Sequence, residues 1–343
     1  MLNGKMRKRY LIYLILTLIV CSCGLEDTTA GYAPDVPIEF KTSKVRVITK
    51  SGDDAQKFDI GTKYKLFAVA AAEGTDDWGN TIMNDIEGEE SAQGVIDYGE
   101  KKSYGLFPCN ILNFYGVTYG NTESVTVASN AYGNRVVNVS LKTDGTLEDL
   151  MYSNNLKSKN ASSGILNMEF AHTLSKLKFE IIKQDETADA DKKLTNATLK
   201  KVILMGTGGQ GTFNIATGKW ENITTQDRVV YDGTFAIENS PKNFAECLAL
   251  PVSDGDVTLR IYLDGIEGGQ EFIDYTLAYD QSNKLRLESN KEYTLSVVVL
   301  KNDVRIVTVT PKVYEWIDVE LDNDDAYLGQ PVFFANLMWM DRN

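Results

Sequence analysis

The sequence predicts an all-β protein of tandem β-sandwich domains, and three observations support this. Apolar and polar residues alternate over much of the chain after residue 36, as in Leu177, Phe179 and Ile181, which are separated by charged residues. This period of two is typical of half-buried strands. Turn-forming Gly, Asn and Asp residues separate the alternating segments, and no segment has a sustained helical stripe. Short strands with frequent turns favour sandwiches.

The alternation predicts strands at 176–181, 257–263, 293–299 and 304–309. A chain of this length exceeds one typical domain, so we expect two. Asn, Ser, Lys and Gly crowd together without apolar periodicity at 156–164, and the predicted boundary lies there. The expected domains are therefore 36–164 and 165–321.

The N-terminus has the pattern of an export signal. Lys5, Arg7, Lys8 and Arg9 precede an apolar run at 10–20, which is shorter than the roughly 20 residues that span a bilayer. The run ends just before Cys23, and this arrangement resembles a bacterial lipobox. We therefore expect residues 1–22 to be a lipoprotein signal peptide, Cys23 to be lipidated and residues 23–35 to form a tether. The lipid would attach the protein to a membrane.

Charge and cysteine content exclude several classes of function. Removing residues 1–22 takes away four positive charges and no negative one, so the net charge of −13 becomes −17. So acidic a chain is repelled by phosphates, and we expect no nucleic acid partner. Cys109 and Cys247 fit no metal-ligand spacing. Both a disulfide between them and two buried free thiols agree with the sequence.

Two short motifs match enzyme signatures by letter only. Residues 206–211 match G-x-G-x-x-G, but 212–215 alternate like a strand where a dinucleotide site needs a helix. We interpret the motif as a glycine-rich hairpin loop. Ser175 and Lys178 match S-x-x-K, but an alternating strand places them on opposite faces.

The titratable residues indicate no enzyme. His172 is the only histidine, which excludes zinc sites built on paired histidines, and we interpret it as a structural residue bonded to the backbone. Residues 322–325 lack the glycine of an EF-hand loop. We expect no catalytic residues, no metal site and no cofactor.

The C-terminal tail, residues 322–343, is unusually apolar. Chain termini are normally polar and frayed, so such side chains need a burial site. One hypothesis is a last strand packed on its own domain, and the other is a donor strand for a groove on another molecule. The candidate donor residues are Val332, Phe333, Phe334, Leu337, Met338, Trp339 and Met340.

Several segments in order along the chain together resemble the fimbrillins of the Bacteroidales, which are type V pilins, and their surface-lipoprotein relatives. The resemblance covers nearly the whole chain. No single segment identifies the family, and it is the occurrence of all the segments in the family's order that supports the resemblance. Its segments are the lipobox at 22–23, Ile38-Glu39-Phe40, residues 48–50, 58–61, 112–117, 149–153, 170–179 and 290–295, and an end near Tyr314-Glu315-Trp316.

The resemblance implies two tandem transthyretin-like β-sandwich domains and a mechanism of assembly. The first strand fills a groove, and a trypsin-like protease cuts after a basic residue, for which Arg46 and Lys50 are the candidates. The groove then accepts a strand from another copy or a related subunit. The family usually has arginine where this chain has Lys50, which makes that site a weaker match. Glu26 and Asp27 resemble the acidic sorting signal that directs some lipoproteins of the Bacteroidales to the outer surface of the outer membrane.

Two classes of function follow from these expectations. The first is a structural fimbrial subunit that supports adhesion to a host or bacterial surface ligand. Stalk, tip and anchor roles all fit, and the basic site together with the apolar tail favours a polymerising subunit. The alternative is a monomeric surface lipoprotein that binds glycans through exposed aromatics such as Trp78, Trp220 or Tyr231.

Overall fold

The structure is a computed structural model, and it confirms the all-β prediction. Its only helical elements, within the residues it describes, are the short 3-10 turns η1 (Tyr104–Leu106) and η2 (Ala161–Ser163). No helix in the described part is long and apolar enough to cross a membrane. The described residues are 36–44, 57–71, 76–92, 94–106, 111–119, 126–141, 149–184, 197–251, 256–265, 272–278, 284–300 and 307–315.

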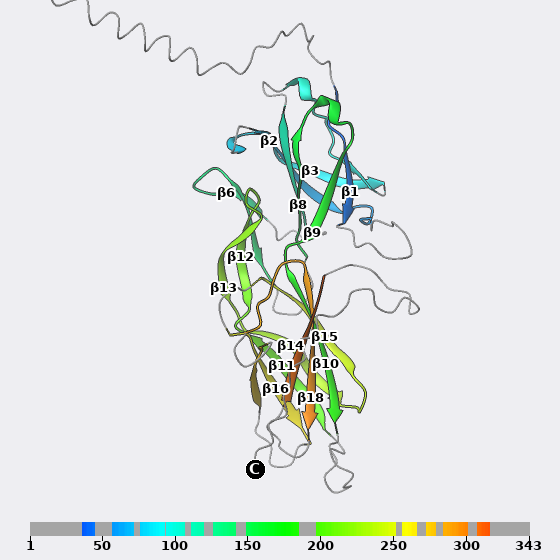
Figure 1. Ribbon diagram of the computed structural model, residues 1–343, viewed down its shortest axis with the longest axis vertical. Coiled ribbons are helices and arrows are strands. Elements are labelled where there is room, and N and C mark those ends of the chain that lie inside the picture. Colours follow the sequence, from blue (N-terminus) through cyan, green and yellow to red (C-terminus); the bar gives the residue numbers. More distant parts are fainter. Residues whose placement is uncertain are drawn as a thin grey trace, which may run out of the picture.

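Seven strands close into a barrel that forms the N-terminal lobe (Figure 1). Their order around the barrel is β1-β4-β3-β2-β5-β8-β9. Its interior is filled by aromatic and aliphatic side chains, including Tyr64, Phe114 and Phe170. The strands are β1 (Phe40–Lys44), β2 (Lys63–Ala71), β3 (Asp76–Ala92), β4 (Val95–Asp97), β5 (Leu112–Thr118), β8 (Met151–Lys159) and β9 (Leu166–His172).

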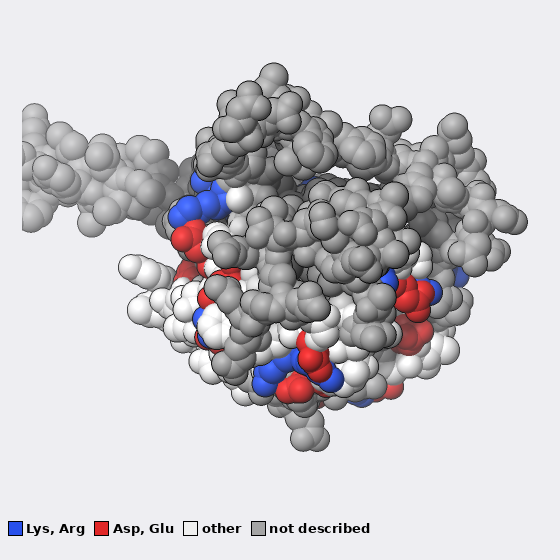
Figure 2. All heavy atoms as spheres, turned by 90° about the horizontal axis from the view of Figure 1, so that it is seen from below, with Lys and Arg blue, Asp and Glu red and all other residues white. Residues whose placement is uncertain are grey.

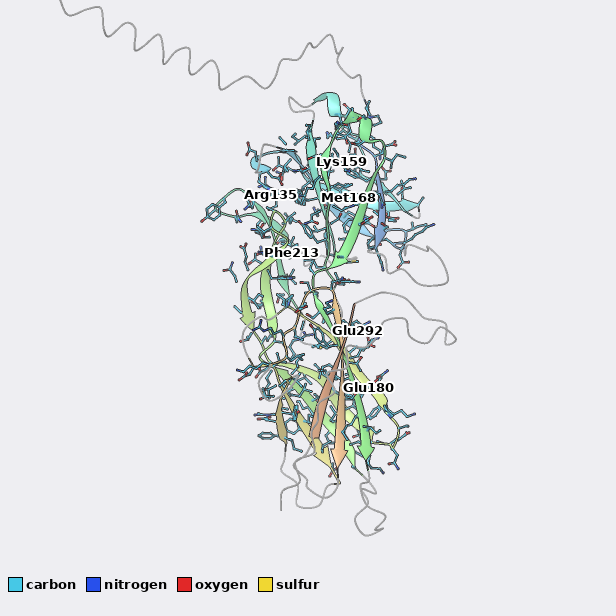
Figure 3. The ribbon with its side chains drawn as sticks, in the orientation of Figure 1. Arg135, Lys159, Met168, Glu180, Phe213 and Glu292 are labelled. Atoms are coloured by element: carbon cyan, nitrogen blue, oxygen red, sulfur yellow. The ribbon has the colours of Figure 1, made fainter. Side chains whose placement is uncertain are left out.

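A second sheet beside the barrel combines strands from the two halves of the chain. Its order is β13-β12-β7-β6. Phe213 of β12, which is labelled in Figure 3, packs edge-on against Tyr152 of β8, with ring centroids 5.0 Å apart. The Tyr152 hydroxyl donates to the Ile215 carbonyl at 2.5 Å. This sheet therefore ties the barrel to later residues. Its strands are β6 (Thr126–Ser129), β7 (Arg135–Ser140), β12 (Gly208–Asn214) and β13 (Lys219–Thr225).

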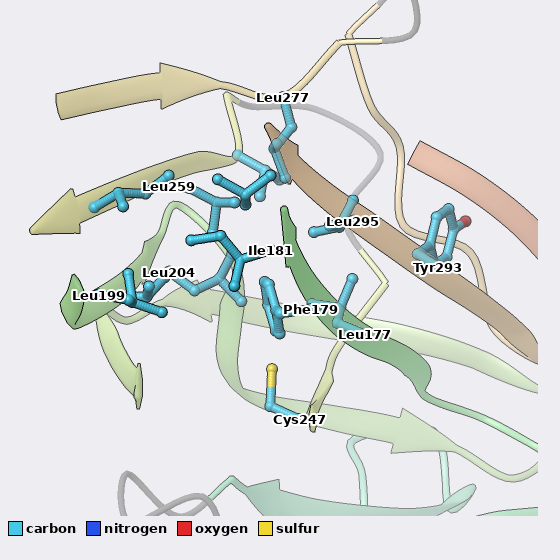
Figure 4. Packing of buried hydrophobic residues seen from close by; sticks show 14 of the residues in the cluster. Leu177, Phe179, Ile181, Leu199, Leu204, Cys247, Leu259, Leu277, Tyr293 and Leu295 are labelled. Atoms are coloured by element: carbon cyan, nitrogen blue, oxygen red, sulfur yellow. The ribbon is translucent and has the colours of Figure 1, made fainter. Parts of the chain in front are cut away.

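The C-terminal lobe is a sandwich of two four-stranded sheets, ordered β15-β10-β18-β19 and β14-β11-β16-β17. Leu177, Phe179 and Ile181 of β10 are fully buried, and Figure 4 shows them in one cluster with Leu199, Leu204 and Leu259 of the other sheet. The strands are β10 (Ser175–Gln184), β11 (Thr198–Met205), β14 (Arg228–Ala236), β15 (Lys242–Ala249), β16 (Thr258–Asp264), β17 (Ile273–Thr276), β18 (Lys291–Leu300) and β19 (Val307–Glu315).

The segment 156–164 is part of the barrel. It contains the end of β8, the turn η2 and the approach to β9, and β9 lies beyond residue 164 yet pairs with β8 and β1. In the described residues, the change from barrel to sandwich comes between His172, the last residue of β9, and Ser175, the first of β10. The division of the chain at residue 164 stays a prediction.

Acidic and basic side chains are interspersed over the sandwich surface. Lys178 pairs with Glu292 at 2.9 Å, Lys201 with Asp232 at 3.1 Å, and Arg260 with Asp274 through two bonds of 2.8 Å. Figure 2, seen from below, shows red and blue side chains next to one another. Exposed pairs of this kind add little stability, but they leave no block of one sign on the described part of this face.

Candidate functional site: the first-strand groove

Strand β1 closes the barrel between two strands that come much later in the chain. It runs parallel to β9, with Phe40 opposite Leu166 and Lys44 opposite Phe170, and antiparallel to β4. We call the trough between β4 and β9, which residues 36–44 occupy, the first-strand groove. Met168, labelled in Figure 3, lies on the β9 wall of this groove and is buried. Without β1 the barrel would have two open edges.

The inward face of this segment is apolar at its start. Ile38 and Phe40 are 0% and 2% exposed, whereas Glu39, which lies between them, and Lys41, which follows Phe40, are exposed. The Phe40 ring meets Phe114 edge-on, with centroids 5.5 Å apart. The alternation seen in the sequence therefore places an aliphatic and an aromatic side chain inside the barrel.

Backbone hydrogen bonds hold the segment on both sides. The Ile38 N–H donates to the Lys102 carbonyl at 2.8 Å, and the Leu166 N–H donates to the Glu39 carbonyl at 2.9 Å. The Tyr98 hydroxyl donates to the Ile38 carbonyl at 2.5 Å. Burial raises the pKa of Tyr98, so this hydroxyl keeps its proton under ordinary conditions.

A buried carboxylate, that of Glu90 on β3, lies under the second half of β1. Glu90 is 0% exposed. The Thr42 hydroxyl lies 2.9 Å and 3.1 Å from its two oxygens, and the Tyr64 hydroxyl donates at 2.8 Å. The backbone N–H groups of Gly94 and Val95 also donate to it. Burial, together with the Glu90 contact, raises the pKa of Tyr64, which keeps it a donor.

Sequence reasoning missed Glu90. It stands at the end of the run 85–90, which contains four acidic residues and looks like a solvated strand face. Alternation separates it from Glu87 and Glu89, which are exposed and pair with Lys65 and Lys63, because Glu90 lies in the opposite phase of the strand. A signal existed in β1, where Thr42 continues the inward phase of Ile38 and Phe40 and therefore needs a polar partner inside the barrel.

The residues predicted for lipidation, for protease cleavage and for the donor strand all lie outside the described residues. These are Cys23, Arg46, Lys50 and the tail residues Val332, Phe333, Phe334, Leu337, Met338, Trp339 and Met340. Their roles stay predictions. Residues 36–44, which the hypothesis places in the groove, are described and occupy it.

The glycine motif at 206–211 is explained by packing. Its glycines at 208, 209 and 211 lie in strand β12, so the expected hairpin loop is corrected to a strand entered through a tight bend. Gly206 has φ +76°, and a Cβ there would lie 2.1 Å from the Asp256 carbonyl oxygen. A Cβ on Gly208 or Gly211 would meet Leu250 at 2.8 Å or 2.5 Å. The glycines therefore let strands and side chains approach closely.

The single histidine is buried beside an acid. Its Nδ1 lies 2.6 Å from the Asp149 carboxylate, so the expected backbone partner is corrected to a carboxylate at this nitrogen. Ser175 and Lys178 both lie in β10, as the alternation predicts, and the Ser175 hydroxyl donates to the Glu288 carbonyl at 2.8 Å. These contacts give each group a structural role.

Cys247 is a free thiol buried in the sandwich core (Figure 4). Burial raises its pKa to about 11, so it stays protonated and unreactive at neutral pH. Cys109 lies outside the described residues. Within the described part, no three His, Cys, Asp or Glu side chains come together as metal ligands.

The aromatic residues considered for glycan binding are occupied by packing. Trp78 is 4% exposed and packs on Tyr115, with ring centroids 4.8 Å apart. The Trp220 indole donates to the Thr173 carbonyl at 2.8 Å, and Tyr231 packs edge-on against Phe244. The expectation that Trp78 is exposed is wrong, because that ring fills a core cluster. Trp220 and Tyr231 are partly buried against core residues.

The fold and the groove together define an all-β protein whose first strand completes a barrel built from later strands. A family model described as Fimbrillin-like matches residues 31–316, so the chain belongs to the fimbrillin-like family. A search of curated proteins found no match.

Two solved structures show a similar fold over most of the chain. One is a fimbrial protein from Bacteroides vulgatus, 14% identical, with a TM-score of 0.57 over 82% of this chain and 99% of that one. The other is a putative cell adhesion protein from Bacteroides uniformis, 20% identical, with a TM-score of 0.52 over 82% of this chain and 100% of that one.

Proposed function

We propose that the protein is a structural fimbrial subunit, exported as a lipoprotein and assembled on the outer surface of the cell by protease-triggered strand exchange. Membership of the fimbrillin-like family supports the general role. The observation that carries the specific mechanism is the placement of β1, which is buried between β4 and β9 and is followed closely by the basic residues Arg46 and Lys50.

Cleavage after either basic residue would break the covalent link between β1 and the later strands of the barrel, while β1 itself would stay in its groove. Residues 45–62 connect β1 to β2 in the sequence, because β1 ends at Lys44 and β2 begins at Lys63. Burying Ile38 and Phe40 contributes about 1.5–3 kcal/mol each. This is enough to hold the strand and small enough for a better strand to displace it.

The same cut would also free the subunit from the membrane. The predicted lipid is on Cys23, on the N-terminal side of β1, so the anchor and the first strand leave as one fragment. The remaining subunit then has an open groove and a free tail. In this scheme, cleavage links release from the outer membrane to competence for assembly.

The apolar tail would supply the replacing strand. Residues 331–340 contain seven large apolar residues, whose burial at about 25 cal/mol per Å² gives on the order of 10 kcal/mol before entropic costs. Strand addition to an open edge also adds backbone hydrogen bonds. The partners are then other copies or related subunits, with a trypsin-like protease as trigger. The filament would present a surface that binds a host or bacterial ligand.

Limited trypsin treatment of the purified precursor tests the proposal. Multimers that survive gel filtration should appear only after a cut at Arg46 or Lys50. A variant with Lys44→Gln, Arg46→Gln, Lys50→Gln and Lys57→Gln has no trypsin site between the end of β1 and Thr62, and it should stay monomeric under the same treatment. A chain ending at residue 321 should be cut and stay monomeric. Multimers in the uncleavable variant, or equal multimers without the tail, would contradict the proposal.

A further inference from the structure

We propose that Glu90 selects the strand that fills the first-strand groove, by requiring a hydrogen-bond donor two residues after an inward aromatic side chain. This inference rests on the proposed strand exchange and names the residue that gives it specificity. In the resident strand the aromatic residue is Phe40 and the donor is Thr42.

The requirement follows from the surroundings of the carboxylate. Tyr64 and the N–H groups of Gly94 and Val95 belong to the barrel and stay when β1 leaves. The Thr42 hydroxyl is the donor that β1 contributes, and it leaves with β1. A replacing strand with an apolar side chain at this point would leave the buried Glu90 side chain without one of its hydrogen-bond donors, and a buried polar group that loses a partner is costly.

The tail of the chain contains the matching pattern. The resident strand reads Ile38-x-Phe40-x-Thr42, and the tail reads Val332-x-Phe334-x-Asn336. Each has a β-branched aliphatic residue, then Phe, then a side chain with a donor, at a spacing that keeps all three on one face of a strand. The Asn336 amide can donate to Glu90 as the Thr42 hydroxyl does.

Asn336 is the only residue of the segment 322–343 that has a side-chain donor two positions after an aromatic residue. In the opposite phase, the register that starts at Phe333 brings Leu337 to Glu90, and the one that starts at Leu337 brings Asp341, a second carboxylate. Trp339 has an indole N–H, but it would put a far larger group in the place of Thr42. The groove therefore fixes the register with Asn336 on Glu90, running parallel to β9 as β1 does.

Peptide binding to the protein without any substitution tests the inference, and because only the peptides are varied, the folding of the protein is not affected. The mature protein is cut after Arg46 or Lys50, and fluorescent peptides of residues 36–44 and 330–340 compete for its groove. Variants Thr42→Val and Asn336→Leu should bind about ten- to a hundred-fold more weakly, as expected when a buried polar group is left without its hydrogen-bond partner. Controls Thr42→Ser and Ala335→Leu, which keep the donor, should bind within about two-fold.

The outcomes separate the two proposals. Equal binding of each peptide and its donor-free variant would overturn the role of Glu90 and leave strand exchange intact. Discrimination at Thr42 without discrimination at Asn336 would overturn the assigned register. If neither unmodified peptide bound, strand exchange itself would fail, and the role of Glu90 would fail with it.

Discussion

Two buried tyrosines beside the first strand differ in their hydroxyl partners, and this predicts opposite effects of one substitution. The Tyr98 hydroxyl donates to Ile38 and accepts from the Lys102 N–H at 3.2 Å. The Tyr104 hydroxyl is buried without a hydrogen-bond partner in the described part of the chain, and burial raises its pKa to about 12.

Tyr98→Phe should therefore lower the free energy of unfolding by about 1–2 kcal/mol, because it leaves two backbone groups unpaired. Tyr104→Phe should change it by less than about 0.5 kcal/mol or raise it, because no bond is lost. Urea denaturation of the two variants measures both effects. A larger loss in Tyr104→Phe than in Tyr98→Phe would contradict the hydrogen bonding described.

The buried thiol of Cys247 predicts a pH dependence. Its pKa rises from 9.0 to about 11 on folding. Because the unfolded thiol ionises first, the contribution of the thiol to stability is complete below pH 9 and is lost as the pH rises from 9 to 11. The stability difference between wild type and Cys247→Ala should shrink by about 2–3 kcal/mol between pH 8 and pH 11. A constant difference in urea titrations at both pH values would contradict the burial.

The residues of the groove show where sequence reasoning ends. Ile38 and Phe40 are inward in the structure, as alternation predicts. Glu90 has the same residue type as its exposed neighbours Glu87 and Glu89, and its partner Thr42 comes from β1, 48 positions earlier in the chain. A contact between strands so far apart depends on their pairing, and single-strand periodicity contains no information on pairing.

At the scale of elements, the bend into β12 predicts the cost of adding one methyl group. Gly206→Ala would combine a positive φ with the clash on the Asp256 carbonyl. Gly99 has a similar φ of +73° with nothing within 4 Å of a Cβ, so it is the matched control. Gly99→Ala should lower the free energy of unfolding by about 1–2 kcal/mol, because alanine is strained at this positive φ. Gly206→Ala should lower it by more, because the clash is added to the same strain. Equal midpoints in thermal denaturation would contradict the close approach.

Strand positions were predictable where one face is buried. The alternating segments 176–181, 257–263 and 293–299 fall on β10, β16 and β18, with their apolar residues mostly buried. Strand β8 leaves a weaker signal in the sequence, because its second half is largely polar and lacks apolar alternation. The parallel pairing of β10 with β18, more than a hundred residues apart, leaves no periodic signal in either strand.

At the scale of the molecule, a separate sheet beside the barrel combines strands from the two halves of the sequence, and this limits where the chain can be divided. Strands β6 and β7 pair into the same sheet as β12 and β13, which follow β10 and β11 in the sequence. The all-β class was predictable from the alternation of apolar and polar residues and from the turn residues between the alternating segments. The closure of a barrel by its first strand was not, because it depends on which late strand returns to β1.

The central claim is that β1 must leave its groove before subunits assemble, and a cysteine lock tests this most directly. Lys41 and Asn167 are exposed and lie opposite each other on β1 and β9, so Lys41→Cys with Asn167→Cys can form a disulfide across the groove. After trypsin cleavage the oxidised variant should stay monomeric, and adding a reductant should release the first strand and produce multimers. Equal multimers in the oxidised and reduced samples would contradict the account.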